Sequence, residues 1–333
     1  MINVTVYIRN DCHLCDQVIK DLQELQNKIP HNVILMDIEN DSSLKELFDM
    51  DIPVVETGPY RLKYSFSKKE LEMTLSASMD RQTHLEKIGS DDYERIKTRS
   101  EKINSTDRIS YWISRHYLLL LNLIVFLYIG FPFLAPALKQ IGADSAAEVI
   151  YRVYKPLCHQ WSFRSFFLFG DQVYYPHEEA NVSGILTFED VTGISDLNDP
   201  NRLFARNFEG NETLGYKVAI CERDVGIWGS ILIFGILFGL SKRKIKGLNW
   251  VLWIILGILP IGLDGFSQVI SQMNIPFLHN ILPYRESTPF LRTFTGFLFG
   301  FTTAWFGYPS IEEAMSDSRR ILAKKFAAIN SKS

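Results

Sequence analysis

The sequence predicts two unlike parts: an α/β domain of order β-α-β-α-β-β-α over residues 1–88, and an α-helical four-span membrane bundle over residues 115–311. The first observation is charge, since residues 1–110 hold 15 basic and 20 acidic residues whereas the following 223 residues hold only 20 and 18. The second is that the later part gathers its apolar residues into long uncharged runs, which is typical of membrane helices. The net charge of −3 and the mean hydropathy of zero therefore average over two different kinds of segment.

The composition excludes several classes of protein. A net charge near zero argues against nucleic acid as a partner. A hydrophobic content of 47%, with 23 Phe and 14 Tyr, excludes a largely disordered chain. Four cysteines are too few for a disulfide-dense secreted scaffold.

The elements of the first part follow from its periodicity. Residues 3–8 are rich in β-branched side chains and predict a strand. Apolar residues recur at helical spacing from Val18 to Ile29, so residues 16–29 predict a helix. The other expected elements are a strand over 32–38, a short helix over 43–50, strands beginning at 52 and 60, and a closing helix over 67–87 with a capping box at Ser67 and Glu70.

Cys12 and Cys15 stand three residues apart between the first strand and the first helix, which is a specific redox signature. At a helix N-terminus, free N–H groups and the macrodipole stabilise a thiolate. We therefore expect Cys12 to be the nucleophile and Cys15 the resolving thiol. The alternative is half a zinc site, which needs a second pair of ligands on the same side of the membrane.

The run Cys12-His13-Leu14-Cys15-Asp16 at the start of a helix resembles the motif of the glutaredoxin-like branch of the thioredoxin superfamily, over about residues 1–88. The resemblance implies a thioredoxin-like fold and dithiol exchange with a partner protein or a low-molecular-weight thiol. It also implies that Pro53, after Ile52, is the cis-proline that aligns the substrate. Two departures weigh against glutathione as a cofactor: His13 replaces the usual Pro, and Ser65-Phe66-Ser67 replaces the expected Gly pair.

The second part begins after a charged linker, residues 89–114. Its four apolar runs are each long enough to cross about 30 Å of hydrocarbon. Gly296 and Gly300, four residues apart in the last run, indicate a close helix contact. The expected spans are about residues 117–138, 225–241, 247–263 and 293–311.

Basic residues predict the orientation of these spans. They cluster at residues 242–246 and in the tail, residues 312–333, whereas the loop over 139–224 has 8 basic and 13 acidic residues. By the positive-inside rule both termini are cytoplasmic and this long loop lies outside. The protein is thus expected to be a multi-pass integral membrane protein, with the lipid bilayer as a partner.

This topology brings polar residues from the long loop and from the ends of three spans to one level of the bilayer. Ionisable groups at membrane depth are usually paired and are often functional. The expected outer polar cluster consists of Cys158, His159, Gln160, Arg164, Cys221, Arg223, Asp224, Asp264, Gln268 and Arg292.

Three interpretations of this cluster stay open. Cys158 and Cys221 form a disulfide on an oxidising outer face; or Cys158, His159, Cys221 and Asp264 bind a metal such as zinc; or Asp264 pairs with an arginine and holds the helices together.

The motifs Cys-His-Gln, Cys-x-Arg-Asp, Asp-Gly-x-x-Gln and Arg-Thr-x-Thr-Gly resemble those of an uncharacterised family of small prokaryotic multi-spanning membrane proteins, over about residues 115–310. The resemblance implies a prokaryotic plasma membrane and lends no activity. We expect a membrane-anchored thiol–disulfide oxidoreductase that uses Cys12 and Cys15 and is coupled to the Cys158/Cys221 pair. The alternative is a redox-gated transporter or ion-binding membrane protein with the thiol domain as its sensor.

Overall fold

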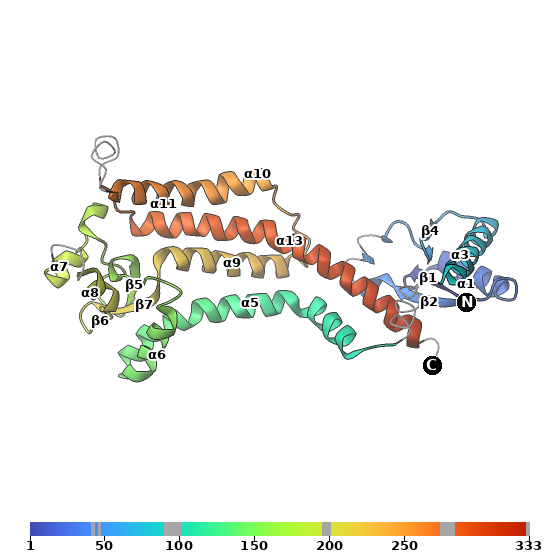
Figure 1. Ribbon diagram of the computed structural model, residues 1–333, viewed down its shortest axis with the longest axis horizontal. Coiled ribbons are helices and arrows are strands. Elements are labelled where there is room, and N and C mark those ends of the chain that lie inside the picture. The colour runs from blue at the N-terminus through green and yellow to red at the C-terminus, as the bar shows by residue number, and fades with distance from the viewer. Residues whose placement is uncertain (41–43, 46–47, 90–101, 195–200, 274–283, 331–333) are drawn as a thin grey trace. The chain divides into compact units, whose positions relative to one another are not determined.

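The computed structural model describes residues 1–40, 44–45, 48–89, 102–194, 201–273 and 284–330 (Figure 1). The chain divides into two compact units. We call residues 1–117 together with 312–333 the N-terminal unit, and residues 118–311 the central unit. Each is described by itself.

The N-terminal unit contains a four-stranded mixed sheet of order β2-β1-β3-β4. Strand β1 pairs in parallel with β2 and antiparallel with β3, and β3 pairs antiparallel with β4. This mixed sheet with its helices fits the expected thioredoxin-like fold. The elements are β1 (Ile2–Ile8), α1 (His13–Leu25), β2 (His31–Asp37), the 3-10 turn η1 (Ile38–Asn40), β3 (Val54–Thr57), β4 (Tyr60–Lys63) and α3 (Lys68–Ile88).

Apolar side chains of both helices join the sheet in one core. Val18 and Leu22 of α1 and Leu71 of α3 are buried with Val4 and Val6 of β1. Burying each such side chain contributes about 1.5–3 kcal/mol. The capping box of Ser67 and Glu70 is present at the start of α3, as expected. The helix expected over 43–50 falls partly outside the described residues.

Two long helices differ from the expected boundaries. Helix α5 (Ser105–Gln140) begins within the expected linker, and α13 (Pro289–Asn330) continues through the expected basic tail. In the N-terminal unit the end of α13 makes ion pairs, from Lys324 to Glu56 of β3 and from Lys325 to Asp107 of α5. The tail residues are therefore part of a packed helix.

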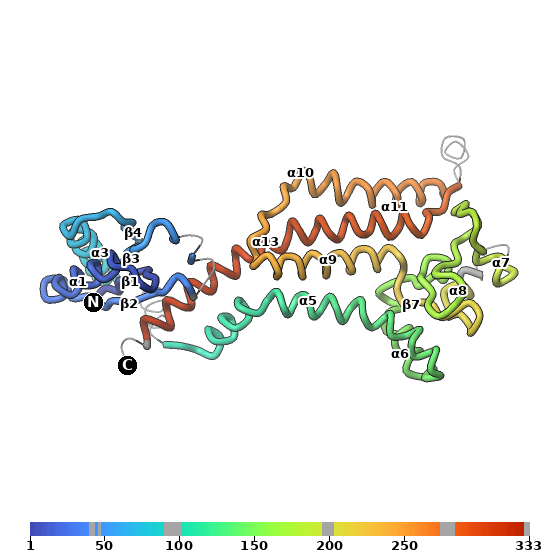
Figure 2. Tube along the Cα trace, turned by 180° about the vertical axis from the view of Figure 1, so that it is seen from behind, coloured from blue at the N-terminus to red at the C-terminus, as the bar shows by residue number. Residues whose placement is uncertain are grey.

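In the central unit, helices α5, α9 and α13 and the helix formed by α10, η4 and α11 lie side by side (Figures 1 and 2). Three of the described helices are long and apolar enough to cross a membrane: Ser105–Gln140, Glu222–Leu240 and Trp250–Gln272. The fourth expected span, 293–311, lies in α13, whose many Gly and Thr residues lower its hydropathy, so a four-span bundle stays a prediction. The bounds are α9 (Glu222–Leu240), α10 (Trp250–Trp253), the π-helical turn η4 (Ile254–Ile258) and α11 (Leu259–Gln272).

Glycines let two of these helices approach closely. A Cβ atom on Gly300 of α13 would lie 2.1 Å from the carbonyl oxygen of Ile227 in α9, and one on Gly296 would lie 2.5 Å from that of Arg223. A Cβ on Gly226 would meet the carbonyl oxygen of Thr293 at 2.3 Å. The close contact expected from Gly296 and Gly300 is confirmed.

The expected loop over 139–224 contains folded structure with its own aromatic core. Phe163, Phe167, Tyr175 and Phe188 are buried together. A three-stranded sheet of order β5-β7-β6 crosses the segment. The elements are α6 (Asp144–Tyr154), the 3-10 turns η2 (Ser162–Arg164) and η3 (Glu178–Ala180), β5 (Ser165–Leu168), α7 (Phe188–Thr192), α8 (Asn201–Asn207), β6 (Gly210–Asn211) and β7 (Gly215–Cys221).

Candidate functional site

Cys12 and Cys15 form a disulfide at the start of α1. Cys12 is the N-cap of the helix, and its Sγ accepts a hydrogen bond from the backbone N–H of Cys15 at 3.2 Å. The two side chains differ in access, because Cys12 is half-buried whereas Cys15 is 2% exposed. In the reduced state the N–H group and the helix dipole would stabilise a thiolate on Cys12.

The Ile52–Pro53 peptide bond is cis, and it lies just before β3. Cys12 packs against the apolar cluster that contains Ile52 and Val54, the two neighbours of Pro53. The structure therefore brings the proline segment to the same cluster as the half-buried cysteine. His13 is exposed at this end of α1.

In the central unit a buried glutamate that the sequence did not single out organises the polar cluster. Glu286 accepts two hydrogen bonds from Arg164, at 2.6 and 2.8 Å, and one each from Gln268 at 2.6 Å and Gln272 at 2.9 Å. Arg292 also pairs with this carboxylate. Burial alone would raise the pKa of Glu286, but Arg164 and Arg292 outweigh it and hold the pKa below its usual range.

A second buried carboxylate, Asp264, has its own donors. It accepts hydrogen bonds from Arg223 at 2.5 Å, from Arg285 at 2.9 Å and from the Ser287 hydroxyl at 2.8 Å. Asp264 and Gln268 lie within α11, which extends to Gln272 and so beyond the expected end of the span at residue 263. Polar partners allow the helix to continue past an otherwise costly buried charge.

One signal in the sequence could have revealed Glu286. The expected cluster contained three arginines, Arg164, Arg223 and Arg292, but only two acidic residues. Buried charges are normally paired, so a further carboxylate was needed nearby. Glu286 supplies it, and Glu222 adds another, which Arg292 contacts at 3.5 Å.

Cys158 and Cys221 are free thiols, and both are buried. The backbone N–H of Cys221 donates to Cys158 Sγ at 3.3 Å. The Cys221 thiol also donates to Cys158 Sγ, which lowers the pKa of Cys158 and raises that of Cys221. A carboxylate oxygen of Asp224 joins the two sulfurs, and the three atoms lie within 4.8 Å of one another.

The remaining expected residues have other roles. Asp264, an expected metal ligand, is engaged by arginines, and Asp224 takes its place beside the thiols. His159 stacks on Trp161 with ring centroids 4.6 Å apart. Burial, followed by the charges of Arg164, Arg292 and Arg223, lowers the pKa of His159, so its ring is neutral at pH 7.

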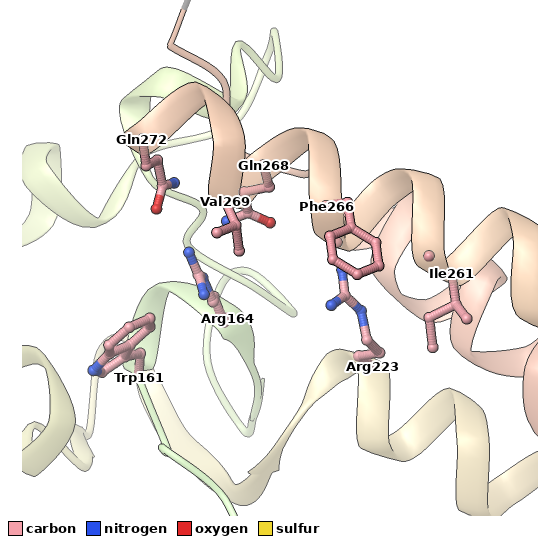
Figure 3. A pocket seen from close by; sticks show the side chains of 10 residues that line it. Trp161, Arg164, Arg223, Ile261, Phe266, Gln268, Val269 and Gln272 are labelled. Atoms are coloured by element: carbon pink, nitrogen blue, oxygen red, sulfur yellow. The ribbon is translucent and has the colours of Figure 1, made fainter. Parts of the chain in front are cut away.

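Two neighbouring cavities open at this cluster. One, of about 300 Å³, is lined by the two thiols, His159, Asp224 and the arginines. The other, of about 470 Å³, is shown in Figure 3, where Arg164 and Arg223 face helix α11 with Phe266 and Gln268. The cluster is therefore a buried charge network beside solvent-accessible space.

Comparison with known proteins supports this division of the chain. Residues 3–76 match a glutaredoxin-like domain family (DUF836), and residues 206–306 match a family described as predicted membrane protein (DUF2085). An uncharacterized protein of Methanocaldococcus jannaschii is 25% identical over 206 residues, which are 59% of this chain and 93% of that protein. No solved structure matches. The expected fusion of a glutaredoxin-like domain to a predicted membrane-protein domain is confirmed.

Proposed function

We propose that this chain, in which a glutaredoxin-like domain precedes a predicted membrane-protein domain, is a thiol–disulfide oxidoreductase held at a membrane. The observation that supports it best is the position of the Cys12–Cys15 disulfide, with Cys12 at the N-cap of α1 and the Cys15 N–H directed at its sulfur. The greater exposure of Cys12 favours attack by this sulfur and resolution by Cys15.

The exchange begins with both cysteines reduced. The Cys12 thiolate attacks one sulfur of a substrate disulfide, forms a mixed disulfide and releases the other substrate sulfur as a thiolate. Cys15, after losing its proton, then attacks Cys12 Sγ and releases the second substrate thiolate. The substrate gains two electrons, and the Cys12–Cys15 disulfide re-forms. A reducing thiol then regenerates the Cys12 and Cys15 thiols and is itself oxidised to a disulfide.

The substrate class is a disulfide of a partner protein or of a low-molecular-weight thiol. We place Pro53 beside it as a positioning residue, since its neighbours Ile52 and Val54 share the cluster against which Cys12 packs. Substrate would approach from the exposed side of Cys12, next to His13.

The bilayer and the orientation complete the proposal. Basic residues at 242–246 and in residues 312–333 favour a cytoplasmic location for both termini. The dithiol would then act in the cytoplasm, where thiol exchange is sustained by a reducing thiol pool.

The test is reduction of a model protein disulfide by the purified full chain in detergent, with dithiothreitol as the reductant. The expected result is turnover by the wild type and loss of turnover in Cys12→Ser. The matched control is the double variant Cys158→Ser/Cys221→Ser, which removes the other two cysteines and should retain the activity. Equal rates in the wild type and Cys12→Ser would contradict the proposal.

A second candidate function, an ion-binding membrane protein with the thiol domain as sensor, is favoured by the group of Cys158, Cys221 and Asp224. Thiol trapping in membranes tests whether the two cysteine pairs are coupled. If the redox state of Cys158 and Cys221 changes when Cys12 and Cys15 are replaced by Ser, the two cysteine pairs form one redox system. If it does not change, the dithiol acts independently of the central unit.

A further inference from the structure

Three acidic groups lie close together in the central unit. The sulfurs of Cys158 and Cys221 and a carboxylate oxygen of Asp224 lie within 4.8 Å of one another. Both cysteines are less than 10% exposed, at 8% and 7%. Among the residues that the structure describes, Asp224 has no Lys, Arg or His nitrogen within 4 Å.

The neighbouring carboxylates differ from Asp224, because each of them is paired with an arginine. Asp264 pairs with two arginines, Glu286 pairs with two, and Glu222 pairs with one. The arginines of the cluster are thus directed at other carboxylates, and Asp224 is left beside two ionisable thiols. Once the thiols lose their protons, two thiolates and a carboxylate this close together repel one another unless a cation joins them.

The two sulfurs are held by parts of the fold that are themselves fixed. Cys221 ends β7 and is the N-cap of α9, so its position is set by a sheet and by a helix. Cys158 precedes Gln160, whose buried amide donates to the carbonyl oxygens of Tyr151 at 3.0 Å and Ala219 at 2.8 Å. The second of these acceptors lies in β7, so the Gln160 amide ties the Cys158 loop to the strand that ends at Cys221.

Further contacts fix the same loop. Gln160 adopts a left-handed backbone conformation with φ of 52°, which is unusual for a residue other than glycine. Its carbonyl oxygen accepts a hydrogen bond at 2.9 Å from Lys217, a lysine only 1% exposed. The backbone N–H of Cys221 directed at Cys158 Sγ is an arrangement that stabilises a thiolate ligand.

We propose that Cys158, Cys221 and Asp224 bind one zinc ion, with a fourth position open to the adjoining cavity. Two thiolates and a carboxylate are ligands that zinc accepts in tetrahedral sites, and three protein ligands with one open position are typical of reactive zinc. Both thiols lose their protons to solvent on binding. The two thiolates balance the two charges of the ion, so the paired charges around the site need not change.

The open position faces the cavity of about 300 Å³ that Arg164, Arg223 and Arg292 also line. A water molecule would be the fourth ligand, since these arginines are already paired with Glu286, Asp264 and Glu222. His159 lines the same cavity, but its ring is stacked on Trp161 and it is not one of the three grouped ligands.

This inference does not rest on the proposed dithiol function, and its test has a different readout. The full chain is purified in detergent without chelator, and its zinc is measured by elemental mass spectrometry. About one zinc per chain is expected for the wild type. Cys221→Ser and Asp224→Asn should each weaken binding by at least about 10–100-fold, the loss that even an outer-shell change can cause.

Two controls keep the result interpretable. Asp171→Asn replaces an exposed aspartate of the same folded segment and should retain the metal. Cys12→Ser/Cys15→Ser removes the other cysteine pair and should also retain it, which separates this site from the dithiol.

A measurement on the unaltered chain covers the case in which the variants do not fold. Cys158 and Cys221 should resist alkylation until a zinc chelator is added, and cobalt substitution should give a thiolate-to-metal charge-transfer band. Zinc content that is unchanged in Cys221→Ser and Asp224→Asn would overturn the proposal. So would a Cys158–Cys221 disulfide in the mass spectrum of the unaltered chain, because a disulfide offers no thiolate ligand.

Discussion

Two cysteines in unrelated parts of this chain occupy the same kind of position. Cys12 is the N-cap of α1 and Cys221 is the N-cap of α9. At Cys12 the helix dipole favours a thiolate, whereas Cys221 donates its thiol proton to Cys158 and its pKa is raised. The partner differs, because Cys12 forms a disulfide with Cys15 one turn along the helix, whereas Cys221 meets Cys158 from a distant loop. The first arrangement favours exchange chemistry, and the second favours a fixed ligand.

Spacing explains what the sequence could reveal about these residues. Cys12 and Cys15 are three positions apart, so a local pattern identifies them. Asp224 precedes one apolar run and Asp264 follows another, so each is easy to notice in the sequence. Their partners, however, are set by tertiary packing. The sequence therefore placed both in one cluster but could not assign Asp264 to arginines and Asp224 to the thiols.

Glu286→Ala should destabilise the full chain by about 3–5 kcal/mol, because it leaves the buried guanidinium group of Arg164 without its carboxylate and Arg292 with Glu222 alone. Unfolding in detergent is the measurement. Glu148→Ala is the matched control, since Glu148 forms an exposed pair with Arg152 at 2.9 Å and its loss should change stability by less than about 1 kcal/mol. Similar losses in both variants would contradict the central role of Glu286.

Glu56 predicts an acid-sensitive contribution to the stability of the N-terminal unit. Burial alone would raise its pKa, but hydrogen bonds from Lys324, Tyr7 and Arg61 outweigh this and lower the pKa. A carboxyl with a lowered folded pKa stabilises the fold above its unfolded pKa, about 4.3, and this stability is lost as the pH falls through the folded pKa.

Unfolding of the full chain as a function of pH tests this. Glu56→Gln should be less stable than the wild type at pH 7, and the difference should shrink at acidic pH. Glu39→Gln, at an exposed pair with Lys45, is the control and should show a smaller difference. A wild-type advantage that grew on acidification would contradict the sign.

At the scale of elements, the local sequence pattern predicted helices and strands with a clear periodicity well, and it predicted segments that depend on tertiary contacts poorly. The strands and helices around α1 and α3 follow their periodicity. The segment over 139–224 does not, because its short strands and turns are stabilised by an aromatic core of distant residues such as Phe163 and Phe188. Lys217 in β7 is buried, and its charge interrupts the apolar pattern by which a buried strand would be recognised in the sequence.

The contact between α9 and α13 gives a prediction at the same scale. Gly300→Ala places a Cβ 2.1 Å from the Ile227 carbonyl oxygen, so the helices must separate, at a cost of about 1–3 kcal/mol. Gly307→Ala is the control in the same helix, since no atom lies within 4 Å of its added Cβ and alanine favours the helix by up to about 1 kcal/mol. The thermal midpoint in detergent should fall in the first and not in the second; a fall of equal size in both would contradict the close contact.

For the whole molecule, the mean hydropathy of zero is an average over two units that are stabilised in different ways. The N-terminal unit packs two helices against a sheet, and the central unit combines long apolar helices with a buried charge network. Each unit carries one pair of cysteines. The proposals assign electron exchange to the first pair and metal binding to the second.

The most direct test of the central claim is to capture the intermediate of the exchange. The full-length Cys15→Ser variant in membranes is mixed with a model protein disulfide, and the product is mapped by mass spectrometry. A mixed disulfide that joins the substrate to Cys12, and that is absent from Cys12→Ser, is the predicted result. If no mixed disulfide forms, or if the substrate is joined to Cys158 or Cys221 instead, the claim that Cys12 is the nucleophile is wrong.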